Sequence, residues 1–482
     1  MKPLAPAALA LCLLCLAAPV HAQPAPVQPG PPLPAPPGAE QPAAPETSDD
    51  PSEASTTPSI AESLPNPDPG GIRAALGERG ITYGLTYIGE TLGNVSGGIR
   101  RGAIYQGRLD PQLDVDFEKL AGLSGLSLHA NAYQIHGRGL SGCCLGNVLV
   151  VSGLEARATT RLYELWLEQK LWGGRVALRV GQLGADTEFF VSQYAALFVN
   201  GTFGWPALTA TALPGGGPAY PLSALGARLK LVPAAGVTFL AAVFNGDPAG
   251  PGSDPQGQNP GGTNVRTGDP PLVLAELSYA YNRGRGAGGL PGTIKLGGYH
   301  HFGRFDDLRF GPNGLSLNDP NAPGVARRLQ GESGVYAVLD QFVWREPGTR
   351  DQGLGLFLRA SASPSQASPL AFYADGGVTY KGLIPGRVND TLGLGVAYAR
   401  FSREARGSDR DAARFGLGSG LVRSSEAVVE VSYQAEIVPG FTVQPDVQYI
   451  IRPGGRVANP RDANGRAVKD AAVFGLRATV RY

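Results

Sequence analysis

Polar and apolar residues alternate along short segments of the chain from about residue 80 to the C-terminus. The segment 161–183 is representative. Glu164, Trp166 and Glu168 fall on one face of an expected strand, whereas Tyr163 and the leucines beside Trp166 fall on the other, because side chains alternate along a strand. A pair of glycines then predicts a tight turn into a second strand. The pattern therefore predicts a hairpin with one apolar and one charged face.

About sixteen such segments follow one another, and the connectors between them alternate in length. The segments are expected near residues 81–90, 104–117, 125–136, 159–172, 174–183, 222–232, 236–245, 272–283, 291–302, 333–345, 353–362, 370–381, 389–402, 424–437, 440–451 and 471–482. Connectors such as 233–235 are short, whereas 184–221 and 403–423 are long. Short turns at one end and long loops at the other are typical of outer-membrane barrels. The sequence thus predicts an all-β fold, a transmembrane antiparallel β-barrel of about 16 strands within residues 71–482.

The charges on the polar faces favour a water-filled lumen over a soluble core. In 104–117, Arg108, Asp110 and Asp114 share one face, and burying such charges without partners would be costly. A lumen keeps them hydrated while the apolar faces contact outer-membrane lipid. The last segment ends in Tyr482, and a terminal aromatic residue is the usual signal for the outer-membrane assembly machinery. We therefore expect the protein in the cell outer membrane.

The N-terminal part has a different composition from the rest. Residues 1–22 combine Lys2, an apolar run and a small residue at the end, and this pattern predicts a secretory signal peptide. Residues 23–70 are rich in proline and alanine, which predicts a disordered periplasmic linker. Residues 71–79 predict one short helix. No later stretch of 18 apolar residues occurs, so the sequence excludes helical membrane spans.

Composition and motifs argue against several other classes of protein. The net charge of +1 does not indicate a nucleic-acid partner. No GxSxG or HExxH motif occurs and no cysteine pair has metal-ligand spacing, so we expect no enzyme activity, metal or cofactor. A barrel-type hydrolase and a plugged adhesive barrel stay open as alternatives. After signal cleavage Cys143 and Cys144 remain, and we expect an ordinary loop role for them, because adjacent cysteines rarely bridge without strain.

Several stretches resemble the carbohydrate-selective porin family of the OprB type. They are GNVSGGIRRGAIYQGRLD (93–110), RLYELWLEQ (161–169), GQL (181–183), EFF (188–190), FNGDP (244–248), VTYKGLIPGRVNDTLGLGVAYARFS (378–402) and VQPDVQYIIRPGG (443–455). The resemblance covers residues 71–482 and implies an outer-membrane porin that passes glucose-type sugars by passive diffusion. A general porin for ions and small solutes, without sugar selectivity, is the alternative.

A sugar-selective pore needs an aromatic surface for the C–H faces of the sugar and charged or amide groups for its hydroxyls. Neighbouring polar faces offer such groups, and we expect the pore lining to include Arg108, Asp110, Asp114, His129, Asn131, Glu164, Trp166, Glu168 and Arg179. The simpler interpretation, in which these charges balance one another in the lumen, stays open for each residue. The expected partners are sugars, lipid and the assembly machinery, and a homotrimer is compatible with the sequence.

The connector 184–221 is expected to fold inward and narrow the pore, as the loop after the fifth strand does in many porins. It contains Asp186, Glu188, Phe189 and Phe190, a mixture of acidic and aromatic residues that suits a loop packed inside a barrel. We expect most of its aromatic residues to anchor the loop to the wall.

Overall fold

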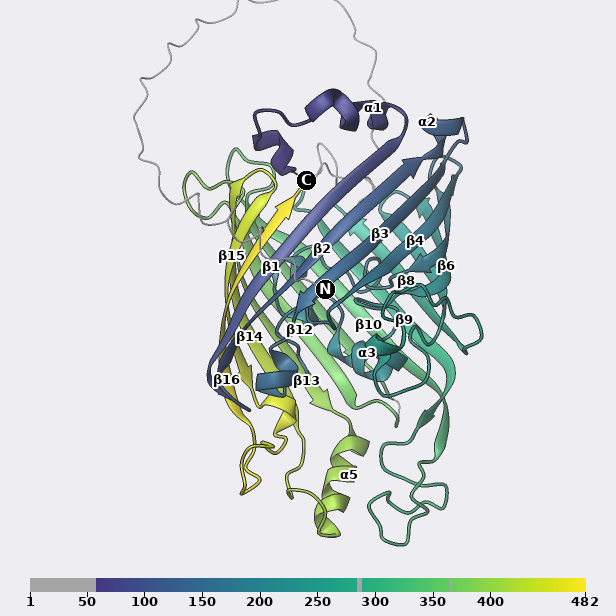
Figure 1. The fold of residues 1–482 in the computed structure, drawn as a ribbon, viewed down its shortest axis with the longest axis vertical. Coiled ribbons are helices and arrows are strands. Elements are labelled where there is room, and N and C mark those ends of the chain that lie inside the picture. The colour runs from purple at the N-terminus through teal and green to yellow at the C-terminus, as the bar shows by residue number, and fades with distance from the viewer. Residues whose placement is uncertain (1–57, 284–287, 365) are drawn as a thin grey trace, which may run out of the picture. The chain divides into compact units, whose positions relative to one another are not determined.

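The computed structural model describes residues 58–283, 288–364 and 366–482. The predicted signal peptide and most of the predicted linker lie outside these residues. Sixteen β-strands, each antiparallel to its neighbours, close into a barrel in which the first strand pairs with the last (Figure 1). The strands are β1 (Ile81–Gly98), β2 (Gly102–Asp116), β3 (Leu126–Gly137), β4 (Thr159–Leu171), β5 (Val176–Leu183), β6 (Ala224–Ala234), β7 (Val237–Asn245), β8 (Pro271–Tyr281), β9 (Gly292–Asp306), β10 (Arg328–Arg345), β11 (Gly353–Ala362), β12 (Leu370–Lys381), β13 (Thr391–Phe401), β14 (Ser425–Val438), β15 (Phe441–Ile451) and β16 (Lys469–Arg481).

The predicted sixteen-stranded antiparallel barrel is confirmed, and each predicted segment coincides with a strand. Several strands are longer than predicted, and β1 and β10 exceed their predicted segments most. β1 continues through a glycine-rich stretch to Gly98, and β10 already begins at Arg328. Backbone pairing with β16 and β9 extends these ends where the side-chain alternation has faded, because ladder hydrogen bonds do not depend on the side chains.

Short helical elements lie at both ends of the barrel and inside it (Figure 1). They are η1 (Ile60–Ser63), η2 (Pro69–Gly71), α1 (Ile72–Glu78), α2 (Phe117–Ala121), η3 (Ser141–Leu145), η4 (Ala195–Leu197), η5 (Gly201–Phe203), α3 (Ala207–Ala212), η6 (Pro214–Gly216), α4 (Pro255–Gln258), α5 (Arg403–Arg414) and η7 (Pro453–Gly455). No helix among the described residues is long and apolar enough to cross a membrane. The predicted helix at 71–79 is confirmed as α1, whereas the end of the predicted linker, residues 58–70, contains the helical turns η1 and η2.

The two faces of the 161–183 hairpin point as the alternation predicts, with one exception. Leu165 and Leu167 on β4 are 44% and 47% exposed and face outward, whereas Glu164 and Glu168 are buried on the inner side. Tyr163 was predicted to face outward, and this prediction is wrong. The register between β3 and β4 shifts at this point, so a β-bulge adds one residue and turns Tyr163 inward beside Glu164.

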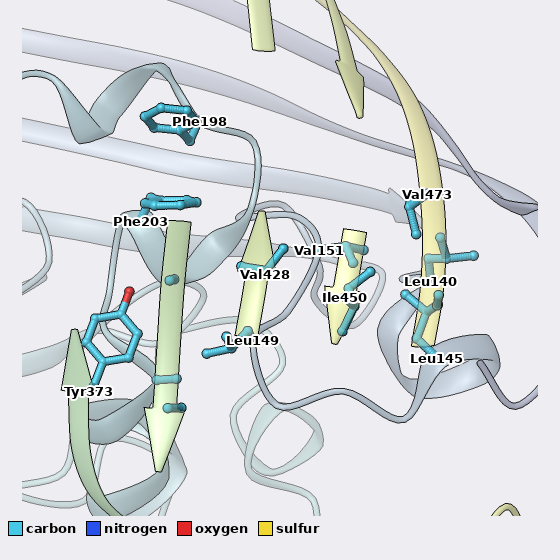
Figure 2. Packing of buried hydrophobic residues seen from close by; sticks show 14 of the residues in the cluster. Leu140, Leu145, Leu149, Val151, Phe198, Phe203, Tyr373, Val428, Ile450 and Val473 are labelled. Atoms are coloured by element: carbon cyan, nitrogen blue, oxygen red, sulfur yellow. The ribbon is translucent and has the colours of Figure 1, made fainter. Parts of the chain in front are cut away.

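Two long loops fold into the barrel and build an apolar core against its inner wall. Loop 138–158 follows β3, and loop 184–223 follows β5. Leu149 of the first loop and Phe198 of the second are buried together with Val428 on β14 and Ile450 on β15 (Figure 2). A part of the barrel interior is therefore packed like a soluble core, and the remaining part stays polar.

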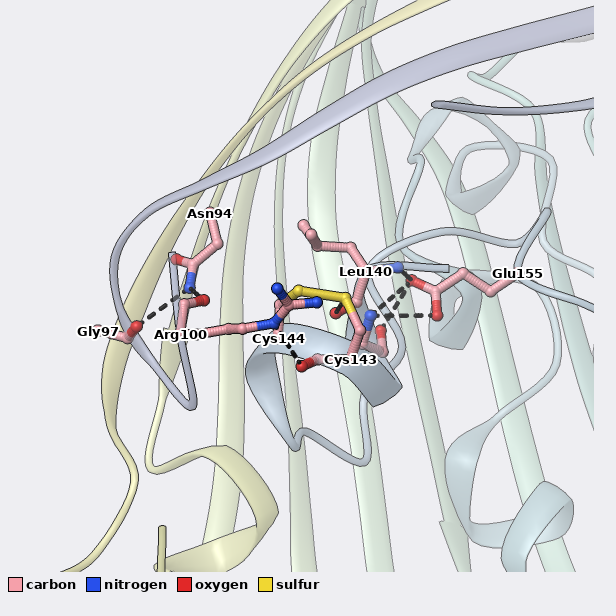
Figure 3. Close-up of a disulfide and its surroundings, with 8 residues drawn as sticks. Asn94, Gly97, Arg100, Leu140, Cys143, Cys144 and Glu155 are labelled. Carbon is pink, nitrogen blue, oxygen red and sulfur yellow. Dashed lines mark hydrogen bonds between the residues drawn. A yellow bond between two sulfur atoms is a disulfide. The ribbon is translucent and has the colours of Figure 1, made fainter. Parts of the chain in front are cut away.

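Loop 138–158 also contains a disulfide between Cys143 and Cys144, within η3 (Figure 3). The expectation of two unbridged cysteines in an ordinary loop is therefore wrong. Local hydrogen bonds hold both residues in one tight turn: the Cys144 amide donates to the Leu140 carbonyl at 3.1 Å, and the Gly146 amide donates to the Ser141 carbonyl at 2.8 Å. This turn fixes the backbone so that two adjacent side chains meet.

Candidate functional site

An aromatic and cationic stack lies on the inner wall formed by β3, β4 and β5. Trp166 on β4 packs against the His129 ring of β3, with 5.0 Å between ring centroids, and against the Arg179 guanidinium of β5, 3.6 Å from the indole centroid. These neighbours come from the strands on either side of β4, so the indole is held from two directions. Cation–π contact of this kind fixes a ring in place. The indole Nε1 has no hydrogen-bond partner within the described part of the chain.

Two arginines and two glutamates form a closed ion network beside this stack. Arg179 donates from Nε to Glu168 at 3.0 Å and from Nη1 to Glu188 at 2.7 Å. Arg228 on β6 donates from Nη2 to the same Glu168 at 2.8 Å, and its Nε lies 2.7 Å from Glu188. Since Arg179 and Arg228 stand directly opposite each other on β5 and β6, the two carboxylates offset what would otherwise be a like-charge pair. The four formal charges cancel.

Sequence reasoning did not find Arg228, although its signal was present. It occupies an inward position of the alternating segment 222–232, in register with Arg179 on the neighbouring strand. A comparison of the inward-facing positions on adjacent predicted strands would have identified Arg228.

A second group surrounds Arg108 on β2. Its guanidinium lies 4.3 Å from the Tyr133 ring centroid and 5.0 Å from that of Tyr220, which belongs to loop 184–223. Asp110 is 3.9 Å from Arg108 and accepts a hydrogen bond from the Asn131 amide at 3.2 Å. The aromatic rings hold the guanidinium, so this group joins strand β2 to the base of the inward loop.

The remaining predicted acidic residues have different surroundings. Asp114 is half exposed and lies 2.7 Å from His129 Nδ1, which connects it to the aromatic stack. Glu164 accepts from the Gly184 amide at 2.9 Å, at the start of loop 184–223. Asp186 accepts from the Tyr163 hydroxyl at 2.6 Å and the Tyr220 amide at 3.0 Å, and burial raises the pKa of its carboxyl. Glu164 and Asp186 therefore hold the loop base.

Phe189 and Phe190 pack into the wall and do not face the open lumen. Both are about 1% exposed. The Phe190 ring stacks on Tyr336 of β10 at 3.6 Å between centroids, and its amide donates to Glu276 of β8 at 3.3 Å. The predicted mixture of acidic and aromatic residues thus divides into two roles: Glu188 joins the ion network, whereas the two phenylalanines attach the loop to the opposite strands.

Further along, loop 184–223 crosses to the far wall. The amides of Val199 and Asn200 donate to Glu430 on β14 at 2.6 and 3.0 Å. The Ser192 hydroxyl and the Gln193 amide donate to Asp340 on β10 at 2.5 and 3.0 Å. Carboxylates that accept backbone amides in this way hold an irregular segment firmly, because the loop donors would otherwise be unpaired.

Loop 138–158 also folds inward, and sequence reasoning treated it as an ordinary long connector. Glu426 on β14 accepts the amides of Val148 and Leu149, the latter at 2.7 Å, and Gln448 on β15 donates to the Val151 carbonyl at 2.8 Å. The signal was the apolar run at 148–151, which is unusual for a loop exposed to water.

The arrangement on β2–β6 combines a fixed aromatic ring with donors and acceptors that are partly open to the lumen. The family profile described as "Carbohydrate-selective porin, OprB family" matches residues 100–482. The chain belongs to this family. Porin B of Pseudomonas aeruginosa is 25% identical to it over 416 residues, which cover 80% of this chain and 86% of that protein.

Two solved structures of OprB from Pseudomonas putida show the same fold. The structure at high pH is 22% identical, with a TM-score of 0.76. The match covers 86% of this chain and 97% of the chain in that structure. The structure at low pH is 18% identical, with a TM-score of 0.52 over the same shares of the two chains. This OprB-family chain is therefore an outer-membrane β-barrel porin, and fold and family indicate a channel rather than an enzyme.

Proposed function

We propose that this OprB-family porin passes glucose-type sugars by passive diffusion, and that they contact the stack of His129, Trp166 and Arg179 during passage. The balanced network beside the stack is the observation that carries this proposal. Arg179 offers donors and Glu188 offers acceptors, with 13% and 18% of their side chains exposed, while the buried Arg228 and Glu168 complete a network whose charges cancel. A neutral polyhydroxyl solute needs both kinds of group, whereas a net charge at this position would favour ions of one sign.

The stack would bind a sugar weakly, as passage requires. Both sides of the indole are engaged by protein, so a pyranose would meet the lumen-facing edge of the stack, with its hydroxyls near Asp114 and Glu188. Asp114 is the most accessible of these groups, with 53% of its side chain exposed. Glu164, Asp186, Phe189 and Phe190 hold the inward loop in position and need not touch the solute.

The test compares sugar flux with salt conductance. In liposome swelling with glucose, xylose and a disaccharide, the double variant Trp166→Ala with Arg179→Ala should lose the preference for monosaccharide, while the barrel still assembles. Its matched control is Trp344→Ala with Arg345→Ala, since both residues are exposed at the end of β10. An unchanged ratio of glucose permeability to salt conductance in the first variant would refute the assignment and favour a general porin.

A further inference from the structure

A shallow groove lies over β1, β2 and β3. These parts of the strands are near the end of the barrel opposite the C-terminus (Figure 1). The lining of the groove includes Thr91 on β1, Ala103 and Tyr105 on β2, and Arg138 just after β3. Long loops mark this end as extracellular. The groove therefore opens toward the outer leaflet of the membrane.

A cluster of polar rings adjoins the groove at its lining residue Tyr105. The Tyr87 hydroxyl contacts the Tyr105 hydroxyl and lies 3.2 Å from His136 Nε2, while Gln134 lies 3.1 Å from His136 Nδ1. The Tyr87 and His136 rings are stacked with only 9° between their planes. They lie flat because Gly107 is beneath them: a Cβ at this position would come within 2.6 Å of His136 Nε2. Such a hydrogen-bonded set is unsuited to the hydrocarbon core and suits the headgroup level.

The change from polar to apolar residues along the strands supports this depth. Toward the periplasmic end, the outward row of β2 continues with Leu109 and Leu113, and that of β1 with Leu85. Leu85 and Leu113 are about 40% exposed, as expected of residues that face acyl chains. The boundary between acyl chains and headgroups thus falls just below Tyr105.

Two exposed arginines belong to the segments that form the groove. Arg138 lines it, and Arg101 lies in the turn before β2, two residues before the lining residue Ala103. Both are exposed, and no ion pair involves either of them in residues 58–283, 288–364 and 366–482. Cations without counterions at the headgroup level attract anionic phosphate.

The turn that carries Arg101 is fixed from inside the barrel. The Ile99 and Arg100 amides donate to the Cys144 carbonyl at 2.8 and 3.1 Å, and the Asn94 amide group donates to the Arg100 carbonyl at 2.8 Å (Figure 3). The disulfide-containing turn of loop 138–158 therefore supports the rim of the groove. A fixed rim loses less conformational entropy when a ligand binds.

We propose that this groove binds the headgroup of a phosphorylated glycolipid of the outer leaflet. Arg101 and Arg138 hold the phosphate, the hydroxyls and imidazole of the ring cluster bind the sugar of the headgroup, and an acyl chain runs down along Ala103 and the leucines below. The occupant is the lipid headgroup, and a second copy of the chain is the alternative that the experiment must exclude.

The experiment measures binding of a diphosphorylated, acylated glucosamine disaccharide to the purified full-length porin in detergent, by native mass spectrometry. The double variant Arg101→Glu with Arg138→Glu should weaken binding by at least about tenfold, and removal of the phosphates from the lipid should do the same to the unaltered porin. The matched control is Arg79→Glu with Arg175→Glu, which changes the net charge equally at exposed positions of the periplasmic end and should bind normally.

Heat-modifiable gel mobility establishes that each variant forms its barrel, and Arg101→Gln with Arg138→Gln replaces the glutamate variant where assembly fails. Equal binding of the phosphorylated and dephosphorylated lipids would overturn the proposal. So would normal binding by the rim variant. The porin could instead form oligomers that exclude the lipid and that the rim variant disperses. This result would assign the groove to a second copy of the chain and would also overturn the proposal.

Discussion

Arg359 on β11 is the residue whose replacement should detach the inward loop most directly. Its guanidinium forms a buried ion pair with Asp375 on β12, with Nη2 2.5 Å from Oδ2. It also donates at 3.0 Å to each of three loop carbonyls, those of Phe190, Thr202 and Gly204. Arg359→Met keeps most of the side-chain length and removes all of these donors.

The magnitude follows from burial of the pair, whose side chains are 3% and 0% exposed. Removing one partner of a buried ion pair costs about 3–5 kcal/mol, because the other charge stays buried without compensation. Each loop carbonyl left without a donor adds about 1 kcal/mol or more if it remains buried. The loop can avoid this second cost by moving away from the wall and becoming hydrated. The main result should therefore be a displaced loop 184–223 inside a barrel that still forms.

Single-channel conductance and urea unfolding in detergent measure the two consequences. Arg359→Met should raise the conductance, reduce its block by added sugar, and lower the free energy of unfolding by about 3–5 kcal/mol. The double variant Arg359→Met with Asp375→Leu should recover part of the stability, because no unpaired charge then remains. Strictly additive effects, or an unchanged conductance in the single variant, would refute this explanation.

Two further predictions concern the loops. Glu426→Ala should release loop 138–158 and the segment at 453–455 together, because Glu426 accepts the amides of Val148, Leu149 and Gly454; faster hydrogen exchange at both places, with no change in α5, checks this. The hydrogen bonds from Arg309 lower the pKa of the Asp411 carboxyl in α5. This ion pair therefore stabilises the folded loop that contains α5 above pH 3.8, and the stabilisation is lost as the pH falls through the lowered pKa. Proteolysis of α5 in the unaltered porin should therefore become faster below about pH 3.8. The variant Asp411→Asn should already be sensitive to proteolysis at pH 7. Equal protection of the unaltered porin and the variant at neutral pH would contradict the assignment.

The barrel was predictable from sequence because its strands lie between lipid and a polar interior. Apolar and polar side chains therefore alternate along each strand. Leu165 and Leu167 face lipid and Glu164 and Glu168 face the interior, and this contrast is local. Tyr163 was misassigned because a β-bulge is set by pairing with the neighbouring strand, and one extra residue reverses the face of everything before it.

The candidate site was partly predictable for the same reason. His129, Trp166 and Arg179 could be placed on one wall from consecutive segments. The attachments of the loops could not, because Glu430 meets Val199 across more than two hundred residues of sequence and the barrel has to close before they come together. The disulfide depends likewise on backbone geometry that spacing alone does not give.

The attachment of loop 184–223 to the far wall has a consequence for which residues of the pore lining can be exchanged. The far-wall attachments of the loop lie on β10, β11 and β14, at Asp340, Arg359 and Glu430, whereas the aromatic and cationic stack lies on β3, β4 and β5. Substitutions of His129 or Trp166 would leave these far-wall attachments in place, whereas Arg179 also holds the loop through Glu188. The lining of this wall can therefore change in shape and polarity while the loop keeps its position on the far wall.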